Sequence, residues 1–252
     1  APNALNIPNA PYPCIHPDNR VTFRVVAPDA QKVTVRLGPG FEMSKAQDGF
    51  WYVTTAPQVV GFHYYTLSID GAVVADPATR SFFGSGFYNS AIEVPDPDGD
   101  YYALKNVPHG QLRELPYFSK SNNSMRRCFV YTPPDYDKDT TRRYPVLYLQ
   151  HGGGEDETGW PGHGKTNLIM DNLIAEGKSK PFIIVMDNGG VGGPRRAGQG
   201  PGARGPGASA AGESNQPRGA AAGPGGGRMG GPGGFGDFAS AFGRVMTEEL
   251  IP

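Results

Sequence analysis

Cysteine is scarce in this sequence. The 252 residues contain two cysteines, Cys14 and Cys128, and neither has the C-x-x-C spacing that is typical of zinc and redox sites. We therefore expect no metal site, and no other motif indicates a cofactor. Two alternatives stay open for the thiols. Both are unpaired, or they form one disulfide that ties an N-terminal arm to a second domain of an exported protein.

An excess of charge of one sign and long apolar runs are also lacking. Lys plus Arg number 23 and Asp plus Glu number 24, so the formal net charge is -1. This balance gives no strongly basic surface, and we expect no nucleic-acid partner. No apolar run reaches the ~20 residues that cross a bilayer, so no membrane span is expected. Because Ala1 is not followed by the charged and apolar regions of a signal peptide, we expect a secreted or periplasmic protein whose signal peptide has been removed.

Glycine is concentrated in residues 189–236, which carry several arginines, a single acid (Glu213) and almost no large apolar residue. Such a segment buries too little apolar surface to offset the entropy cost of ordering it. Its glycines have no three-residue period, which excludes a collagen-like structure. We predict a disordered insertion at these positions.

Residues 20–95 have the period-two pattern of half-buried strands. Apolar residues alternate with polar ones in RVTFRVV (20–26) and KVTVRLG (32–38), and turn residues follow at a spacing of ~8–12 residues. In SIDG (68–71) the Asp-Gly pair suits the two positive-φ positions of a tight hairpin. We predict an all-β sandwich of the immunoglobulin-like type at 20–95, after an arm at 1–19 and before a polar linker at 96–106.

The pattern changes in residues 107–252. Nearly all-apolar strands are predicted at YPVLYLQ (144–150) and PFIIVMD (181–187). Between them, TNLIMDNLIAEG (166–177) has Leu168, Ile169, Leu173 and Ile174 at helical spacing, and Gly177 is placed to end the helix. Continuous apolar strands on either side of a helix indicate a parallel sheet. We therefore predict that 107–252 is the N-terminal part of an α/β domain.

The stretch GWPGHGKT (159–166) matches the G-x-x-x-x-G-K-[ST] pattern of a phosphate-binding P-loop. Asp187, at the end of an apolar strand, has the position of a magnesium-binding carboxylate. However, a P-loop leaves its strand directly, whereas HGGGEDET separates this motif from the strand that ends near Gln150. Pro161 also removes one backbone donor. We keep a nucleotide hydrolase as a remote alternative, and we expect Lys165 to be a solvated residue at a helix start.

The HGGG stretch, His151 to Gly154, comes directly after the strand at 144–150. In α/β-hydrolases a loop of this kind supplies one backbone N–H of the oxyanion hole. Glycine suits this place because bare backbone must approach the tetrahedral intermediate closely. Gly153 is the best candidate donor, and Gly152 and Gly154 would shape the turn. The alternative is an ordinary glycine-rich turn.

Several segments in order resemble carbohydrate esterase family one, which contains feruloyl and acetylxylan esterases. They are VPHGQLRELPYFSKS, RRCFVYTPPDYD, RYPVLYLQHGGGEDETGW, TNLIMDNLIAEGK, PFIIVMDNG and TEELIP. Residues 20–85 resemble the carbohydrate-binding module of the glycogen-branching-enzyme type, family forty-eight. The resemblance implies an α/β-hydrolase fold and a carboxylic ester hydrolase that releases feruloyl or acetyl groups from plant polysaccharide, namely acylated xylan.

The resemblance also implies a Ser-His-Asp triad whose serine lies in a G-x-S-x-G turn. The sequence reaches Pro252 before any such motif, so we expect the triad beyond this residue and no ester hydrolysis by this polypeptide alone. Ser209 is rejected as the nucleophile because no strand precedes it. His109, His151 and His163 do not match the family's catalytic histidine.

The resemblance places Trp160 and His151 at the rim of a substrate pocket. The indole of Trp160 would stack on an aromatic acyl group such as ferulate, or it closes the loop by packing. Asp187 and Asn188 end a strand at the edge where α/β sites form, and we expect both to support the site without contacting substrate.

Sugar rings pack on flat aromatic faces, and the candidates in the predicted sandwich are Trp51, Tyr52, Tyr64 and Tyr65. Neighbours on a strand face opposite sides, so we expect one ring of each pair to lie in the core. The alternative to glycan binding is packing in the core and between domains. A non-catalytic glycan-binding protein is accordingly the second functional hypothesis. The oligomeric state is not predicted.

Overall fold

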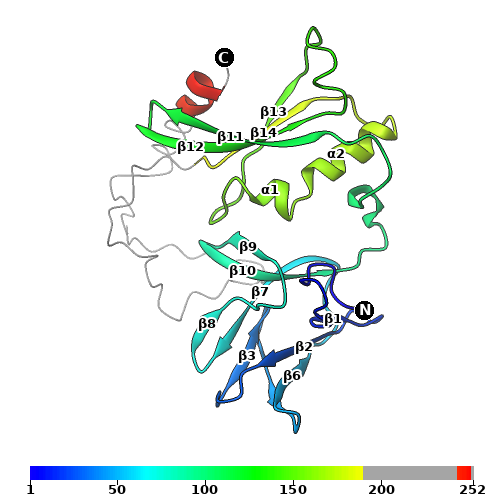
Figure 1. Cartoon of the computed structure of the whole chain (residues 1–252), viewed down its shortest axis with the longest axis vertical. Coiled ribbons are helices and arrows are strands. Elements are labelled where there is room, and N and C mark those ends of the chain that lie inside the picture. Colours follow the sequence, from blue (N-terminus) through cyan, green and yellow to red (C-terminus); the bar gives the residue numbers. More distant parts are fainter. Residues whose placement is uncertain (190–242, 251–252) are drawn as a thin grey trace, which may run out of the picture. The chain divides into compact units, whose positions relative to one another are not determined.

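The computed structural model describes residues 1–189 and 243–250 (Figure 1). Within the chain, contacts define two compact units. The first consists of Ala1–Tyr117 and Arg127–Asn188, and the second of Phe118–Arg126 and Gly189–Pro252. The predicted disordered insertion lies, apart from Gly189, outside the described residues. The domain boundaries inferred from the sequence stay predictions.

Strands outnumber helices in the described residues, and most strands are short. The strands are β1 (Cys14–Ile15), β2 (Val21–Val26), β3 (Val33–Arg36), β4 (Phe41–Glu42), β5 (Ser44–Lys45), β6 (Phe50–Thr54), β7 (Gly61–Ile69), β8 (Ala72–Val74), β9 (Ser81–Gly84), β10 (Phe87–Val94), β11 (Gln111–Ser119), β12 (Ser124–Thr132), β13 (Val146–Tyr148) and β14 (Ile183–Asp187). The helices are η1 (Gly99–Tyr102), α1 (Gly159–Gly162), α2 (Thr166–Ala175) and η2 (Val245–Leu250).

Two sheets of the N-terminal part share one hydrophobic core. One has the order β1-β2-β6-β5, and the other has β4-β3-β7-β10-β9 with β8 paired to β7. The predicted alternation is confirmed on β2 and β3: Val21, Phe23 and Val25 of β2 and Val33 and Val35 of β3 are buried, while the residues between them are half-buried. The core combines residues of both sheets, among them Val21, Phe23, Val35, Leu67 and Ile92. The immunoglobulin-like type of this arrangement stays a prediction.

Two hairpins have two-residue turns with positive φ. The turn predicted at SIDG is confirmed, since Asp70 (φ 48°) and Gly71 (φ 91°) connect Ile69 of β7 to Ala72 of β8. Ser85 (φ 55°) and Gly86 (φ 85°) connect β9 to β10 in the same way. Positive φ at both turn residues matches the right-handed twist of the paired strands, which is why such turns are favoured.

The third sheet has the order β11-β12-β14-β13. As predicted, β13 is parallel to β14, with α1 and α2 between them in sequence (Figure 1). The expectation of a nearly all-apolar buried strand at 144–150 is wrong. Only three residues are extended, and Val146 and Leu147 are 44% and 42% exposed; among the described strands, β13 pairs with β14 alone. On β14, Ile184, Met186 and Asp187 are buried, and Ile183 and Val185 are half-buried.

Helix α2 ends as predicted but does not bury the predicted face. Gly177 has φ 68° and its N–H donates to the carbonyl of Ile174, which closes the last turn. The apolar positions expected to be buried are only half-buried; instead Met170, Asp171 and Asn172 are buried. Asn172 donates to the carbonyls of Tyr101 and Ala103 at 2.9 and 2.8 Å, so the polar face holds the segment predicted as a linker.

Both cysteines are free thiols, which favours the unpaired alternative. Cys128 lies on β12 and is buried, and burial, together with the nearby charges of Asp187 and Glu157, raises the pKa of its thiol to about 11. Cys14 lies on β1 and is half-buried. No helix in the described part of the chain combines the length and the hydropathy required to cross a bilayer.

The shared core is tested by truncating one valine inside it and one outside it. Val35→Ala removes two methyl groups from a fully buried site and is expected to lower the free energy of unfolding by about 2 kcal/mol. Val26 is 70% exposed, and Val26→Ala is expected to change the free energy of unfolding by less than about 0.5 kcal/mol. Urea midpoints at constant m measure both. Equal losses in the two variants would contradict the proposed core.

Candidate functional site

The HGGG loop leaves the end of β13, at the carboxyl edge of the parallel β13–β14 pair. Ligands of α/β proteins bind at this edge because the loops after parallel strands meet there. Gly152, Gly153 and Gly154 are all exposed, and the N–H of Glu155 donates to the carbonyl of Gly152 at 3.3 Å, which closes a tight turn. Gly154 has φ 85°, a conformation that favours glycine.

Gly153 has the properties required of a backbone donor. Its N–H donates no hydrogen bond to any residue in the described ranges, and no heavy atom lies within 4 Å of the position that a Cβ would take. The other two glycines have neighbours at that position, Glu155 for Gly152 and Ser85 for Gly154. Among the three glycines of HGGG, Gly153 alone has no described atom near its Cβ position.

His151 holds the loop to the next strand. One ring nitrogen, Nε2, lies 2.5 Å from the carbonyl oxygen of Asn188, directly after β14, and Nδ1 lies 2.7 Å from the carbonyl oxygen of Gly152. Gln150 donates to the same Asn188 carbonyl at 3.4 Å. Both ring nitrogens of His151 therefore contact backbone oxygens, and the ring orients the loop. The role in substrate binding predicted for it stays a prediction.

Glu157 is a buried acid that the sequence did not point to. It accepts hydrogen bonds from Nε of Arg127 on β12 and, at 2.7 Å, from Nδ2 of Asn188. Burial by itself raises the pKa of Glu157, but the hydrogen bonds from Arg127 and Asn188 outweigh it and hold the pKa below its usual value. The carboxylate therefore stays charged and joins Arg127 of β12 and Asn188, directly after β14, to the segment that follows HGGG. Only the pairing of the strands brings these residues together.

Trp160 lies in α1, directly after the HGGG segment. Its indole Nε1 donates to the carbonyl of Gln150 at 2.9 Å, and the residue is 38% exposed. A Cβ at Gly164 would come within 2.8 to 3.0 Å of Trp160, so the following turn lies directly against this residue. The packing role is thus observed, and part of the ring remains accessible. Stacking on an aromatic acyl group stays a prediction.

The stretch that matches a P-loop has another structure. Its first four residues form the helical turn α1, which does not follow a strand directly. The expectation that Lys165 is solvated is wrong: its ammonium group forms an ion pair with Glu93 on β10 and lies 4.4 Å from the centre of the Tyr102 ring. Asp187 accepts a hydrogen bond from the hydroxyl of Tyr117 at 2.8 Å. These contacts agree with the structural role predicted for Asp187.

The four candidate sugar-binding rings lie in different surroundings. As expected, one ring of each pair is buried: Trp51 donates to the carbonyl of Ala27, and Tyr65 donates to Asp76. Because both rings lie inside the core, neither has a face that a sugar can reach. Tyr52 is half-buried, and its hydroxyl donates to Asp48 at 2.9 Å.

Tyr64 contacts the segment after HGGG. Its hydroxyl lies 3.3 Å from a carboxylate oxygen of Glu155 and 3.1 Å from Nε2 of His163. Burial is the main cause that raises the pKa of Tyr64, and the charge of Glu155 adds to it, so the hydroxyl stays protonated as a donor. The structure thus shows this residue packed against the segment after HGGG, and the predicted domain boundary between them stays a prediction.

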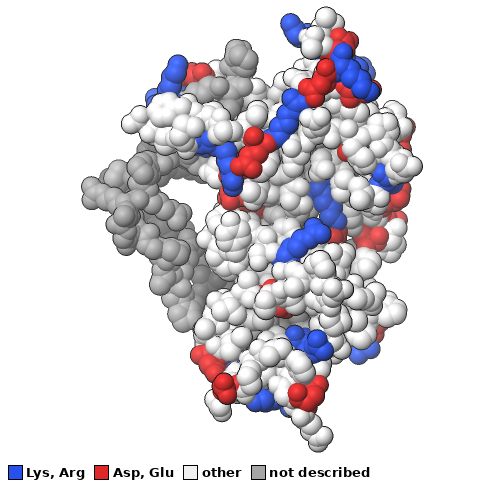
Figure 2. All heavy atoms as spheres, viewed as in Figure 1, with Lys and Arg blue, Asp and Glu red and all other residues white. Residues whose placement is uncertain are grey.

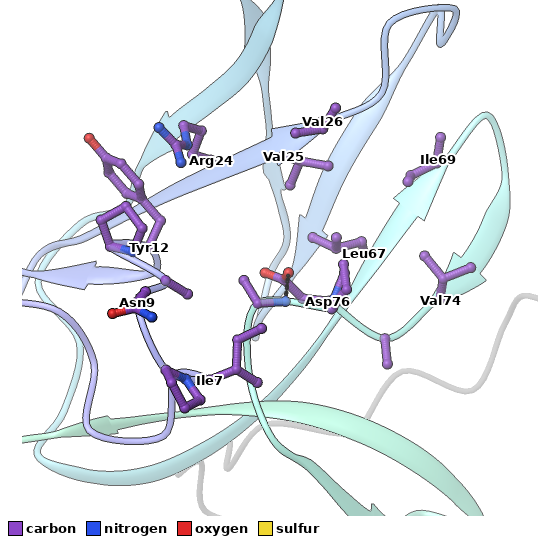
Figure 3. Close-up of a pocket in the computed structure, with 16 residues that line it drawn as sticks. Ile7, Asn9, Tyr12, Arg24, Val25, Val26, Leu67, Ile69, Val74 and Asp76 are labelled. Carbon is purple, nitrogen blue, oxygen red and sulfur yellow. Dashed lines mark hydrogen bonds between the residues drawn. The ribbon is translucent and has the colours of Figure 1, made fainter.

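A cavity of about 460 Å³ opens between the N-terminal arm, β2 and β7 (Figure 3). Tyr12 and Arg24 lie at one end of it, and Ile69 and Val74 at the other. The guanidinium carbon of Arg24 lies 4.8 Å from the centre of the Tyr12 ring and covers one of its faces. Tyr12 is the aromatic residue in the cavity wall, and Arg24 occupies one face of its ring. The other walls are mainly apolar, formed by Ile7, Pro8, Ala10, Pro11, Val25, Val26, Leu67, Ala75, Pro77 and Ala78.

Charges are mixed in the described part of the chain. On the face shown in Figure 2, Lys and Arg side chains lie beside Asp and Glu side chains. Residues 1–189 and 243–250 contain no group of three or more His, Cys, Asp or Glu placed to hold a metal ion.

His109, before β11, and Asp171, on α2, form a pair. The buried Asp171 carboxylate on α2 lies 2.8 Å from Nδ1 of His109 and accepts hydrogen bonds from the Tyr131 hydroxyl at 2.7 Å and the Gly110 N–H at 2.9 Å. The other ring nitrogen, Nε2, faces the carbonyl of Lys105 at 3.0 Å. The hydrogen bond to Asp171 raises the pKa of His109 above its usual value. Because the imidazolium satisfies both acceptors, this pair connects the start of β11 to α2.

The pH dependence of stability tests this pair. A raised pKa in the folded state means that the stabilisation from His109 is fully present below pH 6.5 and is lost as the pH rises through the folded-state value. His109→Gln removes the titration. We expect the difference in urea midpoint between wild type and this variant to shrink from pH 6 to higher pH. A difference that stays constant over this range would show that His109 does not hold its proton through Asp171.

The chain is similar in sequence to two curated bacterial enzymes. The endo-1,4-beta-xylanase/feruloyl esterase of Xylanibacter ruminicola is 48% identical over 197 residues, which cover 75% of this chain and 27% of that protein. The endo-1,4-beta-xylanase Y of Acetivibrio thermocellus is 33% identical over 126 residues, which cover 48% of this chain and 11% of that protein. The chain thus spans about a quarter or less of the length of these curated relatives.

The enterobactin esterase of Shigella flexneri, solved in the presence of enterobactin, has a similar fold. The TM-score is 0.51 at 18% identity, and the match covers 67% of this chain and 52% of that one. This likeness concerns the fold alone. Residues 119–214, which include the HGGG loop, match the model of the family described as "Putative esterase". The family match and the xylanase/feruloyl esterase relative agree with the esterase resemblance of the sequence.

Proposed function

We propose that this chain carries the oxyanion-hole loop of a carboxylic ester hydrolase that releases feruloyl or acetyl groups from plant xylan. The observation that carries the proposal is the Gly153 N–H, which is unpaired among the described residues, has open space beside it and lies at the carboxyl edge of the parallel strands. The match of residues 119–214 to an esterase family supports it.

The reaction that fits this loop is acyl transfer through a serine ester. The serine oxygen attacks the ester carbonyl carbon while a histidine takes the hydroxyl proton, and the carbonyl oxygen becomes an oxyanion. The N–H of Gly153 donates to this oxygen, and such a donor is worth roughly 3–4 kcal/mol in the transition state. The histidine then protonates the leaving alcohol, and water releases the acid by the same route.

The nucleophile is not among the described residues in this proposal. The sequence contains no G-x-S-x-G, so no residue of the printed chain has the expected motif of the serine. The described His109–Asp171 pair stabilises the start of β11 and is not assigned to the triad. We assign the serine, histidine and acid to residues outside 1–189 and 243–250.

The choice of xylan as substrate rests on the relatives, whose names describe xylanases and a feruloyl esterase. The partly exposed ring of Trp160, beside the HGGG loop, offers a flat face to an aromatic acyl group. A polymeric substrate outside the cell also requires a secreted or periplasmic enzyme, which agrees with the localisation expected from the sequence.

Glycan binding without catalysis, the second hypothesis, has less support. Of the four candidate rings, Trp51 and Tyr65 are in the core and Tyr64 contacts Glu155, which leaves Tyr52 as the ring on an outer face. Retardation of the protein in gels that contain xylan or starch measures glycan binding directly.

The oxyanion role is tested by a matched pair of substitutions at Gly153. Gly153→Pro removes the N–H and is expected to lower kcat by about 10²–10³-fold. Gly153→Ala keeps the N–H, and its methyl group enters open space, so kcat is expected to stay near the wild-type value. Steady-state hydrolysis of methyl ferulate and of 4-nitrophenyl acetate by the whole protein measures both variants and shows which acyl group is preferred. Equal kcat values for the two variants would contradict the donor role.

A further inference from the structure

The HGGG loop contacts the turn between β9 and β10. The N–H of Gly86 donates to the carbonyl of Gly154 at 2.8 Å, although the two residues are far apart in the sequence. Gly86 belongs to the two-residue hairpin turn in which it and Ser85 both have positive φ. The turn therefore supplies a backbone donor to a carbonyl oxygen of the HGGG loop.

The contact between these two segments leaves no room for a side chain on the loop. A Cβ at Gly154 would lie 3.0, 3.3 and 3.4 Å from the Cα, N and C atoms of Ser85. These neighbours are backbone atoms, which do not move aside as a flexible side chain does. Gly154 is thus required twice, by its φ of 85° and by the closeness of the turn. This second requirement has no counterpart in a free glycine-rich turn.

A second contact comes from β7. The hydroxyl of Tyr64 has Glu155 and His163 as partners at 3.3 and 3.1 Å, and Glu155 closes the HGGG turn through its bond to the carbonyl of Gly152. The ring of Tyr64 lies directly over Gly84 of β9, since a Cβ there would come within 2.6 Å of it. Tyr64 is therefore held between a strand of the N-terminal sheet and the segment after HGGG.

Aromatic packing and an ion pair extend this contact. The imidazole of His163, after α1, stacks on the ring of Phe62 with centres 4.8 Å apart and an angle of 21° between the planes, and it meets the ring of Phe82 edge-on. Further on, Lys165 is paired with Glu93 on β10. Three segments thus contact the N-terminal sheets. The HGGG loop contacts the β9–β10 turn, His163 after α1 contacts β7 and β9, and Lys165 before α2 contacts β10.

We infer that the β9–β10 turn and Tyr64 are positioning residues for the HGGG loop. They hold the Gly152–Gly154 backbone in the geometry in which the Gly153 N–H is unpaired among the described residues and the space at its Cβ position is open. The N-terminal sheets are then part of the ester-hydrolysing site and not only a separate glycan-binding module. The catalytic consequence rests on the proposed function, whereas the positioning itself does not.

A matched pair of glycine substitutions tests the turn. Gly86 and Gly71 both occupy the second position of a two-residue hairpin turn, at φ 85° and 91°, and a Cβ at either would meet no atom within 4 Å. Gly86→Ala and Gly71→Ala therefore introduce the same backbone strain, but only the first turn donates to Gly154. Similar thermal midpoints in the two variants show that their global stabilities are matched.

The readout is the backbone ¹⁵N order parameter of the three HGGG glycines. In wild type and Gly71→Ala we expect values near those of rigid backbone, about 0.85, and in Gly86→Ala values below about 0.6 at Gly153 and Gly154. Tyr64→Phe introduces no backbone strain and is expected to speed amide exchange at Glu155 roughly fivefold, as expected for the loss of one hydrogen bond. Tyr88→Phe, an exposed tyrosine on β10, is its control and is expected to leave this exchange unchanged.

Steady-state kinetics of methyl ferulate hydrolysis by the same variants distinguishes an effect on the position of the HGGG loop from an effect on the stability of the fold. A displaced oxyanion donor acts on the transition state, so Gly86→Ala is expected to lower kcat at least about tenfold with KM within about twofold of wild type. Gly71→Ala and Tyr88→Phe are expected to keep both constants.

Each outcome decides one statement. Order parameters in Gly86→Ala equal to those in Gly71→Ala overturn the positioning, whatever the activity. The catalytic consequence is overturned if Gly86→Ala lowers the order parameters of the HGGG glycines but leaves kcat unchanged, while Gly153→Pro abolishes activity. Whole wild-type protein, with the triad present, that hydrolyses neither ester contradicts the proposed function, and the order parameters still decide the positioning.

Discussion

The parallel pairing of β13 with β14 is the constraint on which the candidate site depends. Val146 pairs with Ile183 and Tyr148 with Val185, so both strands run to the same edge of the sheet. The loops that follow them must then meet, and His151 reaches the carbonyl of Asn188. The buried carboxylate of Glu157 accepts a hydrogen bond from the side chain of Asn188. Contacts at the ends of these strands therefore hold the HGGG loop, and the Gly153 N–H has no partner among the described residues.

Close approach of backbone and side chains at glycine is the second feature that organises the site. At Gly84 the neighbour is the ring of Tyr64, at Gly154 it is the backbone of Ser85, and at Gly110 it is the ring of Tyr131 together with the Thr132 carbonyl. A methyl group at any of these positions would come to 3.0 Å or less of its neighbour. Glycine therefore acts here through the space it leaves as much as through its backbone freedom. Of these contacts, the one at Gly154 connects the N-terminal sheets to the loop.

Much of the site's support was not readable from residue patterns. Lys165 was expected to be solvated and nothing in the sequence pointed to Glu157, yet Glu93 binds the first, and Arg127 and Asn188 bind the second, through contacts that span 30 to 72 positions of sequence. No periodicity encodes such pairs, because they depend on which strands lie side by side. The same reason explains the polar buried face of α2: its partners lie on η1, β12 and the segment between them, and a helical pattern of apolar residues does not reveal them.

Some features of the fold depend only on residues that are close together in the sequence. The alternation in β2 and β3, the Asp70–Gly71 turn, the end of α2 at Gly177 and the HGGG loop after a strand all depend on side-chain period, positive φ or the lack of a Cβ. Tertiary structure decided the rest. It rejected the P-loop, because four matching letters define a phosphate site only when a strand feeds them directly. It also placed Gly86 against Gly154, since a hydrogen bond between distant turns forms only when the sheets that carry them pack together.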